Sequence, residues 1–405
     1  MKYKVIIVGA GPVGLLLANF LGSQHIETLV IEKDIIRKPW SKAIGISPPT
    51  LEILRKLDLD KTIIREGIKG RKAVFYGTKL PLGTLKIENL LSRYSFILTL
   101  SQAKTEKILE ENLKNYSSIA LSRGLEVINI NYVNGLYEIK CYDTQNTQER
   151  CYFSEIICAC DGENSIIRKV EKIGFIGYHY KPTFIMGDYY DRSSLKQNAV
   201  LWFTKKGTVE SFPLPGKKRR WIIQTSKFIK KPNIGFFEKI IQDRTGYSLN
   251  DKDKISENPF GVQKFLAKTY WKNKVFLCGD SAHTMSPIGG QGMNTGFADA
   301  EFLAYIVTLY FQNSAINLNE LAIKYEKYRK IAAKSATLRA DVGMRIGTAR
   351  NYFFSVIRSL ILAILFHLPI TRFLIPYFTM VNIPYNKLDN VLQKEDLLKS
   401  ALIIR

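Results

Sequence analysis

Three glycines near the N-terminus have the spacing that a phosphate-binding turn requires. Gly9, Gly11 and Gly14 follow an apolar stretch and open a segment with helical periodicity, and Glu32 lies about 20 residues further on. The first glycine of such a turn permits a tight bend, the second lets a pyrophosphate approach the backbone, and the third lets helix and strand pack closely. The helix N-terminus faces the phosphate charge, and the acid accepts hydrogen bonds from ribose hydroxyls. The pattern therefore predicts a dinucleotide site.

Two later segments also end an apolar strand beside an acid and a glycine. Asp161 and Gly162 follow the segment EIICAC, and Gly279 and Asp280 follow VFLC. A carboxylate at a strand end can bind a ribityl hydroxyl. The glycine-rich turn over residues 287–294 then leads into a predicted helix, whose N-terminal amides face whatever lies before it.

These motifs need alternating strands and helices to position them. Strands are predicted at 4–9 and 29–31 with a helix at 12–22 between them, which makes one β-α-β unit. Further helices are predicted at 48–57, 102–113 and 293–311. Short alternating strands indicate a sheet that is inserted twice. The predicted fold class is α/β, with a Rossmann-like domain formed by 1–71, 100–177 and 266–317, a mixed β-sheet substrate domain formed by 72–99 and 178–265, and C-terminal helices over 318–405.

Composition limits the classes of partner and compartment. The 405-residue chain carries a formal net charge of +23, and 46% of its residues are hydrophobic, which allows a large core. The charge suits nucleic acid, an anionic membrane or an anionic substrate, but no nucleic-acid module is recognisable. The basic residues are dispersed except for the run 217–220, which we expect at an exposed hairpin tip. Five cysteines without a CxxC pair argue against disulfides and a zinc site, so we expect no metal and a cytoplasmic location.

The opening segment also has the basic start and apolar run of a signal peptide. However, the three glycines interrupt the run, no small-residue cleavage site follows, and the next stretch, ETLVIEKD, has the pattern of a second strand. We therefore assign the segment to the fold.

In this order and spacing, the three motifs resemble those of the class A flavoprotein monooxygenases, the para-hydroxybenzoate hydroxylase type. The first corresponds to that family's GxGxxG motif, residues 161–162 to its DG motif, and residues 279–280 with Pro287 to its GD motif. Further similarities are the segment SKAIGISPPTLEILRKL and Gln102 with Glu106 on the next predicted helix. The resemblance covers most of the chain.

The resemblance implies FAD as the cofactor and gives individual residues a role. Gln102 would contact the ribityl chain, Asp280 the ribityl or pyrophosphate region, and Asp161 both FAD and NADPH. Pro287 and Gly289 would lie at the flavin C4a, where oxygen adds, and are the implied catalytic positions. The implied cofactor-binding residues are Gly9, Gly11, Gly14, Glu32, Lys33, Lys42, Gln102, Asp161, Gly279, Asp280, Pro287, Gly290, Gly292, Met293 and Asn294.

Lys42 departs from the family pattern. The family usually has arginine there, in a segment of the SRA type, and a lysine cannot make the same bidentate contacts. This puts the NADPH-contact role of the position in question. No second glycine fingerprint follows, so NADPH or NADH is expected to bind transiently, as in the family. The WxWxIP signature of flavin-dependent halogenases is also absent.

Side chains of the inserted sheet are candidates for the substrate pocket, because the resemblance places that sheet over the flavin. Ordinary sheet core is the alternative for each aromatic. His179 is expected at the surface or with its hydrogen bonds satisfied, and His283 beside the GD turn, and neither is assigned a catalytic role. The substrate candidates are Tyr189, Trp202, Phe212 and Pro213.

Residues 352–381 form a very apolar C-terminal segment. Arg358, His367, Pro369, Arg372 and Pro376 interrupt it, which argues against a spanning helix. Helices packed on the core are the leading interpretation. The alternative is a peripheral membrane contact, or a surface that receives a lipophilic substrate.

Taken with the resemblance, the sequence predicts an enzyme that uses FAD, NADPH or NADH and O2 to oxygenate an aromatic or polyketide-like molecule through a flavin C4a-hydroperoxide. One alternative is a flavin-dependent reductase or dehydrogenase of the geranylgeranyl reductase type. Another is a flavin-binding, membrane-associated protein without turnover. The sequence leaves the substrate and the oligomeric state open.

Overall fold

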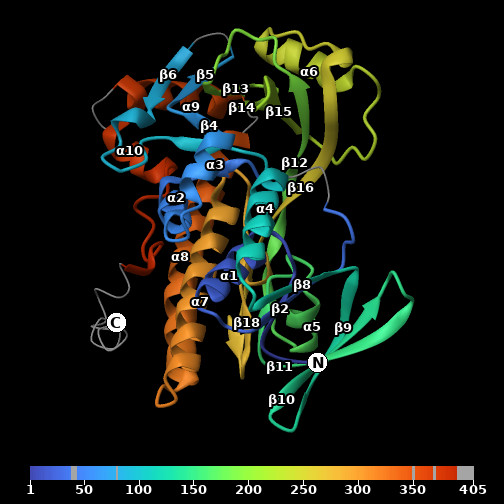
Figure 1. Cartoon of the computed structure of the whole chain (residues 1–405). Helices are drawn as coiled ribbons and strands as arrows, with labels where there is room; N and C mark the ends of the chain where they lie inside the picture. Colours follow the sequence, from blue (N-terminus) through green and yellow to red (C-terminus); the bar gives the residue numbers. More distant parts are fainter. Residues whose placement is uncertain (38–42, 79–80, 349–351, 368–370, 390–405) are drawn as a thin grey trace.

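The computed structural model describes residues 1–37, 43–78, 81–348, 352–367 and 371–389. Within these ranges the chain has a mixed α/β architecture with two large sheets. Figure 1 shows the first sheet in the lower half of the molecule and the second in the upper half, with long helices beside them. The motifs of the sequence come together between these sheets.

The first sheet is built around a central strand that is apolar on both faces. In β1 (Lys2–Val8) the four residues from Val5 to Val8 are buried, as expected for a parallel strand covered by helices on both sides. β1 pairs in parallel with β2 and β11, β2 with β8, and β11 with β18. The remaining members of this sheet are β2 (Thr28–Glu32), β8 (Ile119–Arg123), β9 (Leu125–Val133), β10 (Leu136–Asp143), β11 (Gln148–Ala159), β17 (Trp271–Lys272) and β18 (Val275–Leu277).

Parallel pairing brings the three motifs to one edge of this sheet. Val8 of β1 lies opposite Ala159 of β11, and Ala159 in turn lies opposite Leu277 of β18. Val8 also lies opposite Ile31, one residue before Glu32. The glycine turn, the acid, the DG turn and the GD turn therefore all leave the sheet from its carboxyl edge, where ligands of open α/β sheets bind.

The second sheet joins strands from both predicted insertions. Its order is β19-β16-β12-β15-β14-β13-β5-β6, and β13 pairs in parallel with β5 although more than a hundred residues separate them. α6 (Phe236–Thr245) packs against one face of the sheet, and the other face looks towards the first sheet. The strands are β5 (Lys72–Tyr76), β6 (Pro81–Lys86), β12 (Phe175–Tyr190), β13 (Ala199–Thr204), β14 (Gly207–Leu214), β15 (Lys218–Thr225), β16 (Lys254–Ala267) and β19 (His283–Thr284).

A third, small sheet is formed by β3 (Gly45–Ile46), β7 (Ile97–Thr99) and β4 (Ile68–Gly70). α1 packs on α7 and α4, and α7 packs on α8. The other helices are α1 (Pro12–Ser23), α2 (Pro48–Arg55), α3 (Asp60–Glu66), α4 (Gln102–Asn112), α5 (Ile166–Val170), α7 (Gln291–Gln312), α8 (Leu318–Thr348), α9 (Tyr352–His367) and α10 (Thr371–Phe378).

One predicted helix is shorter than expected and is followed by a second. The helix predicted at 48–57 ends at Arg55, because Asp58 adopts a left-handed φ of 56° that no helix can continue through. α3 then starts at Asp60. The spacing of the apolar residues had predicted one continuous helix here.

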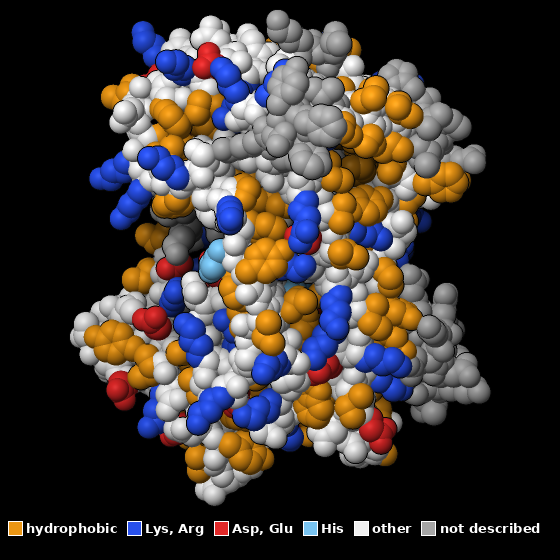
Figure 2. Space-filling model, turned by 180° about the vertical axis from the view of Figure 1, so that it is seen from behind, with side chains coloured by type: hydrophobic (Ala, Val, Ile, Leu, Met, Phe, Trp, Pro, Cys, Tyr) orange, Lys and Arg blue, Asp and Glu red, His pale blue; other side chains and the backbone are white. Residues whose placement is uncertain are grey.

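The basic run 217–220 is only partly at a hairpin tip, so that prediction was wrong for its arginines. Lys217 lies exposed in the turn, but Arg219 is fully buried and Arg220 is 3% exposed. Arg219 pairs with Asp191 at 2.8 Å and Arg220 with Asp188 at 2.7 Å. These acids follow or lie on β12, the neighbour of β15, and neutralise the arginines within the fold. Elsewhere, Figure 2 shows Lys and Arg scattered over one face of the molecule among hydrophobic side chains.

The C-terminal helices pack against the second sheet, as the leading interpretation expected. Phe366 of α9 stacks on Phe75 of β5 with ring centroids 4.5 Å apart, and Ile375 of α10 is buried in the same cluster. The opposite side is open: Leu360 is 61% and Phe373 63% exposed. None of the described helices combines the length and apolar character that crossing a membrane requires.

Candidate functional site

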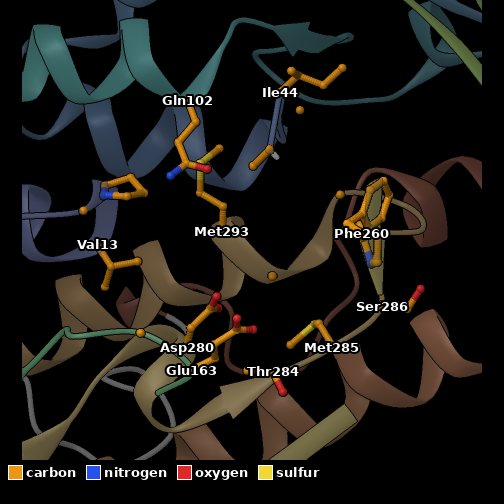
Figure 3. A pocket seen from close by; sticks show the side chains of 18 of the residues that line it. Val13, Ile44, Gln102, Glu163, Phe260, Asp280, Thr284, Met285, Ser286 and Met293 are labelled. Carbon is orange, nitrogen blue, oxygen red and sulfur yellow. The ribbon is translucent and has the colours of Figure 1, made fainter. Parts of the chain in front are cut away.

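A cavity of about 1200 Å³ lies between the carboxyl edge of the first sheet and the inner face of the second. Single-ligand pockets usually measure about 300–1,000 Å³, so this cavity has room for more than one ligand. In Figure 3, Gln102 and Met293 reach into it from one side, and Asp280 and Glu163 from the other. The three sequence motifs therefore share one space with the wall of the second sheet.

The glycine turn has the close approaches that its spacing predicts. Gly9 has a φ of 103°, and a Cβ there would lie 2.4 Å from the carbonyl oxygen of Cys160. A Cβ on Gly14 would lie 2.0 Å from the Gly9 carbonyl oxygen, so α1 can pack on the turn only without a side chain. A Cβ on Gly11 would meet nothing within 4 Å. Gly11 and Gly9 line the cavity and Gly14 lies behind it.

Two backbone amides, one of them in the N-terminal glycine turn, orient the Glu32 carboxylate. Its Oε2 accepts a hydrogen bond from the Ala10 amide at 2.8 Å, and its Oε1 accepts one from the Asp34 amide at 2.9 Å. Each carboxylate oxygen keeps further lone pairs for a ribose hydroxyl. Glu32 and Lys33 both line the cavity.

Gln102 begins α4 and is oriented by its own helix. Its Nε2 donates to Glu106 Oε1 at 2.8 Å, one turn along, and Ser101 caps the helix by accepting from the Lys104 amide. Burial raises the pKa of the Glu106 carboxyl, which the Gln102 hydrogen bond and the charge of Arg37 partly offset. The Gln102 side chain points into the cavity from this anchored position.

The DG turn carries a buried oxygen that lacks a partner. Asp161 Oδ2 accepts from the Ile167 amide at 3.2 Å, whereas no residue of the described chain donates to its buried Oδ1. Burial raises the pKa of this carboxyl. Arg168 ties the turn to the GD turn by donating to the carbonyl oxygens of Glu163 at 2.7 Å and Ser281 at 2.9 Å.

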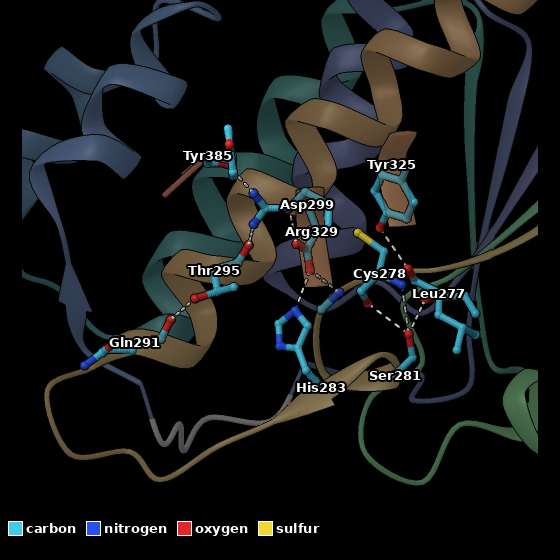
Figure 4. A network of polar contacts seen from close by, with 12 residues as sticks. Leu277, Cys278, Ser281, His283, Gln291, Thr295, Asp299, Tyr325, Arg329 and Tyr385 are labelled. Atoms are coloured by element: carbon cyan, nitrogen blue, oxygen red, sulfur yellow. Dashed lines mark hydrogen bonds and ion pairs between the residues drawn. The ribbon is translucent and has the colours of Figure 1, made fainter. Parts of the chain in front are cut away.

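The GD turn is fixed by a buried ionic network (Figure 4). Asp299 of α7 accepts from the Gly279 amide at 3.0 Å, from His283 Nε2 at 2.6 Å and from Arg329 Nε at 2.6 Å. Arg329 of α8 also donates to the carbonyl oxygens of Thr295 and Tyr385. His283 therefore packs beside the GD turn, as predicted. Asp280 lies on the exposed side of this turn and lines the cavity.

The charge of Asp299 is stabilised by its partners. Burial alone would raise the pKa of the carboxyl, but the charges and hydrogen bonds of Arg329 and His283 lower it to about 2. Asp299 is therefore ionised at neutral pH. It positions Gly279 and thereby Asp280, without reaching the cavity itself.

The glycine-rich turn before α7 brings backbone to the cavity wall. Gly289 and Gly290 have φ values of 80° and 64°, and Pro287, Gly289, Gly290, Gly292 and Met293 all line the cavity. No side chain caps α7, so no capping side chain accepts from its first amides, and Gly290, Gly292 and Met293 at this end of the helix line the cavity. This geometry agrees with the predicted placement of a helix N-terminus.

The side chain of Asn294 makes its contacts within the protein. Its side chain is 2% exposed and lies off the cavity lining. Its Oδ1 accepts from the Ser47 amide at 2.9 Å and from Thr50 Oγ1 at 2.7 Å, and its Nδ2 donates to the Gly45 carbonyl oxygen at 3.0 Å. Asn294 thus holds the start of α7 against α2 and β3. Gly279 likewise lies off the lining, and Lys42 lies outside the described residues.

The four substrate candidates divide between the two faces of the second sheet. Phe212 and Pro213 line the cavity. Trp202 is 4% exposed and stacks on Trp221 on the opposite face, beneath α6, and Tyr189 donates from its hydroxyl to Glu238 of α6 at 2.7 Å. The substrate assignment of Tyr189 and Trp202 is therefore withdrawn. Strand alternation decides the face, and the sequence alone did not fix which face was inner.

Sequence reasoning missed two groups of residues. Asp299 and Arg329 form the network behind the GD turn, and the signal for Asp299 was an acid inside the apolar helical run TGFADAEFLAYIV. Glu210 lines the cavity from β14, and its signal was an acid in the middle of a predicted strand. His179 is exposed, as expected.

The residues present fit an extended dinucleotide such as FAD. The space at Gly11 accommodates a phosphate against free amides, and the unpartnered Oδ1 of Asp161 offers a buried acceptor. Glu32 also lines the cavity, and Figure 3 shows Gln102 and Asp280 on opposite sides of it.

The chain matches the family model described as "FAD binding domain" over residues 2–340. It is 30% identical to an "uncharacterized aromatic compound monooxygenase" of Bacillus subtilis, over 78% of this chain and 63% of that protein. It is 25% identical to the rifampicin monooxygenase of Streptomyces venezuelae, over 74% of this chain and 62% of that protein. The chain thus spans less than two thirds of the length of these relatives.

The fold has counterparts among solved structures. The p-nitrophenol 4-monooxygenase of Pseudomonas putida superposes with a TM-score of 0.87 at 18% identity, over 94% of this chain and 98% of that one. The anhydrotetracycline hydroxylase of Streptomyces rimosus superposes with a TM-score of 0.77 at 23% identity, over 95% and 77%. At these identities the likeness concerns the fold alone.

Proposed function

The chain belongs to the FAD binding domain family, and from that membership we propose that it is an FAD-dependent monooxygenase that uses NADPH or NADH and O2 to oxygenate an aromatic or polyketide-like molecule. The observation that carries the proposal is one continuous cavity, lined by the three dinucleotide motifs on one side and by the wall of the second sheet on the other. The relatives reported above carry monooxygenase names, one of them for aromatic compounds and one for rifampicin.

We propose the following arrangement of the cofactor. The amides at the start of α1 hold the pyrophosphate beside Gly11, and Glu32 binds the adenosine ribose. Gln102 and Asp280 bind the ribityl chain, and Asp161 offers its free oxygen nearby. The redox-active ring then lies along residues 287–293, under the second sheet. This proposal treats the first sheet with its helices as a Rossmann-like FAD domain and the second sheet as the inserted substrate domain.

Bound FAD would supply the redox chemistry, by accepting a hydride from the nicotinamide cofactor and activating O2. The chain itself provides position and electrostatics. The free amides at the N-terminus of α7 stabilise negative charge that develops on the reduced ring. Phe212 and Pro213 close the cavity on the substrate side, which excludes water from the reacting atoms. Pro287 and Gly289 supply backbone and ring surface rather than a titrating group.

The test starts with cofactor content and reduction. The purified protein should carry or take up FAD, and the yellow colour should be bleached by NADPH or NADH without oxygen. Oxygen uptake should then rise when an aromatic compound is added. Reduction of an added substrate without oxygen uptake would instead support a reductase. If neither NADPH nor NADH bleached the flavin, whichever candidate substrate was present, the result would support a flavin-binding protein without turnover.

We also propose a peripheral contact of α9 and α10 with anionic membranes. Leu360, Ile361 and Ile364 on α9 are between 50% and 61% exposed, and Phe373 on α10 is 63% exposed. The net charge of +23 favours an anionic surface. Flotation with anionic vesicles should carry the protein upward, less so for an Ile361→Asp variant. Full recovery of the wild-type protein in the soluble fraction would remove the proposal.

A further inference from the structure

Glu210 is an acidic residue on the largely apolar wall of the second sheet. It lies in the middle of β14, opposite Leu201 of β13 and Ile222 of β15. All three residues line the cavity. Because neighbours in register share a face, the Glu210 side chain points to the cavity and away from α6.

The row of residues that crosses the sheet at this level is apolar on both sides of Glu210. Phe75 lies opposite Leu201, and Met186 lies opposite Ile222. Both also line the cavity. A leucine would pack better than a carboxyl group in such a row, because an apolar surrounding does not stabilise a polar group. We therefore attribute the presence of Glu210 to a contact with a molecule bound in the cavity.

The Glu210 row faces the turn where we place the reactive part of the cofactor. Ile222 packs in one cluster with Ile288, the residue after Pro287. Thr208, two residues before Glu210 on the same face of β14, and Ile288 both lie beside Gly347 of α8, since a Cβ on Gly347 would be 4.0 Å from Thr208 and 3.8 Å from Ile288. A molecule bound between this turn and β14 would therefore contact Glu210.

Among the described residues, Glu210 has no hydrogen bond or ion pair. The charged groups on the neighbouring elements are engaged elsewhere. Arg220 on β15 pairs with Asp188, Arg244 on α6 donates to backbone carbonyl oxygens of β14 and β15, and Arg358 on α9 donates to backbone at the end of α8. Burial raises the pKa of the Glu210 carboxyl to about 7, with no contribution from a neighbouring charge.

The lysines on the described lining stand at other parts of the cavity. Lys33 follows Glu32 at the adenosine end, and Lys169 lies on α5 beside the DG turn. Lys72 is the first residue of β5, and its Nζ lies 3.6 Å from Glu88 Oε1. On the described wall of the second sheet, the lining cation Lys72 thus stands beside an acid at the start of β5, whereas Glu210 stands among apolar residues in the middle of β14.

We propose that Glu210 selects the substrate: it accepts a hydrogen bond from a hydroxyl or amine on an aromatic ring system and discriminates against aromatic carboxylates. The inference rests on the proposed function in so far as it takes the wall of the second sheet as the substrate site. A half-buried acceptor without a partner in an apolar surrounding gains most from a donor, and two carboxylates close together in such a cavity repel each other strongly. The preference holds although the protein as a whole is strongly basic.

The test measures binding rather than turnover. Equilibrium dialysis of the FAD-loaded protein at pH 8, without NADPH, compares four naphthalene probes that share one ring system: 2-naphthol, 2-naphthylmethylamine, 2-methoxynaphthalene and 2-naphthoate. The variants are Glu210→Gln, which keeps the shape and removes the charge, and Glu210→Leu, which removes the acceptor. Glu149→Gln, an exposed acid on β11, is the matched control. FAD content reports whether each variant folds.

We expect the wild-type protein to bind the hydroxyl and amine probes about tenfold or more tightly than the ether, and the carboxylate least of all. Compared with the wild type, Glu210→Gln should bind the carboxylate probe at least about tenfold more tightly and the amine probe correspondingly more weakly. Glu210→Leu should lose the preference for the hydroxyl probe over the ether probe. The Glu149→Gln control should bind all four probes as the wild type does. The inference is overturned if the wild type binds the carboxylate best, if it binds neither donor probe, or if the Glu210 variants keep its order. Failure to oxygenate any compound would count against the proposed function and leave this binding order unaffected.

Discussion

The two glycines of the N-terminal turn should respond differently to alanine, because one faces the helix and the other the ligand. A Cβ at Gly14 would lie 2.0 Å from the Gly9 carbonyl oxygen, a backbone atom that cannot rotate away. Ordinary contacts begin at 3.4 Å, so α1 would have to move away from the turn by roughly 1.4 Å against a packed interior. At Gly11 the backbone φ of −70° is open to any residue, and a Cβ would meet nothing within 4 Å.

These contacts set the expected magnitudes. Overpacking in Gly14→Ala should lower the free energy of unfolding by about 3 kcal/mol. The better helix propensity of alanine should offset about 1 kcal/mol of this, so the net loss is about 2 kcal/mol. Gly11→Ala should leave the stability of the FAD-free protein within about 0.5 kcal/mol of the wild type. It should weaken FAD binding at least about tenfold, because the methyl group occupies the space through which the pyrophosphate approaches the amides.

Urea unfolding of the FAD-free proteins and titration with FAD, followed by quenching of flavin fluorescence, separate the two effects. The reasoning is refuted if Gly11→Ala binds FAD as the wild type does, or if Gly14→Ala unfolds at the wild-type urea concentration. Equal losses of stability in both variants would also contradict it, since the structure gives Gly11 no protein neighbour to displace.

Three further predictions follow from the same geometry. Asp299→Asn should lower the free energy of unfolding at pH 7 by about 3–5 kcal/mol and weaken FAD binding. Because the pKa of Asp299 is lowered to about 2, about 2 kcal/mol of the wild-type stability depends on its ionisation; this part should be present above the usual pKa and disappear as pH falls from about 4 to 2, as urea unfolding against pH would show. A variant as stable as the wild type at pH 7 would refute the role of the network. Glu32→Gln should weaken FAD binding by about tenfold with little change in FAD-free stability, and unchanged affinity would remove the ribose contact. Trp202→Leu should lower the unfolding free energy by about 2–4 kcal/mol but leave KM unchanged once a substrate is known, whereas a large rise in KM would return Trp202 to the substrate site.

The sequence predicted the parts of the site that depend on local geometry. The glycine spacing, the acid at the end of β2 and the acids after β11 and β18 are short-range patterns, and parallel pairing brings them to one edge. The sequence does not show which face of a strand points inward: Trp202 and Phe212 are both aromatic residues on neighbouring strands of the second sheet, and the packing of α6 decides which face it covers.

Long-range partners were also beyond the sequence. Nothing near Arg219 or Arg220 in the chain shows that Asp191 and Asp188 will lie beside them on the neighbouring strand, so a hairpin tip was the reasonable expectation and was wrong. Asp299 and Arg329 meet across two helices, α7 and α8. Both cases concern buried charges whose partners are set by tertiary packing, which periodicity does not report.

Oxygen labelling tests the central proposal most directly. The FAD-loaded protein is supplied with NADPH, or NADH, and a panel of phenols, fused-ring aromatics and tetracycline-like compounds under ¹⁸O2, and the mass of each product is measured. We expect a product that has gained one oxygen atom carrying the label. A product that has gained unlabelled oxygen, or a substrate that has gained hydrogen and no oxygen, would contradict the proposal.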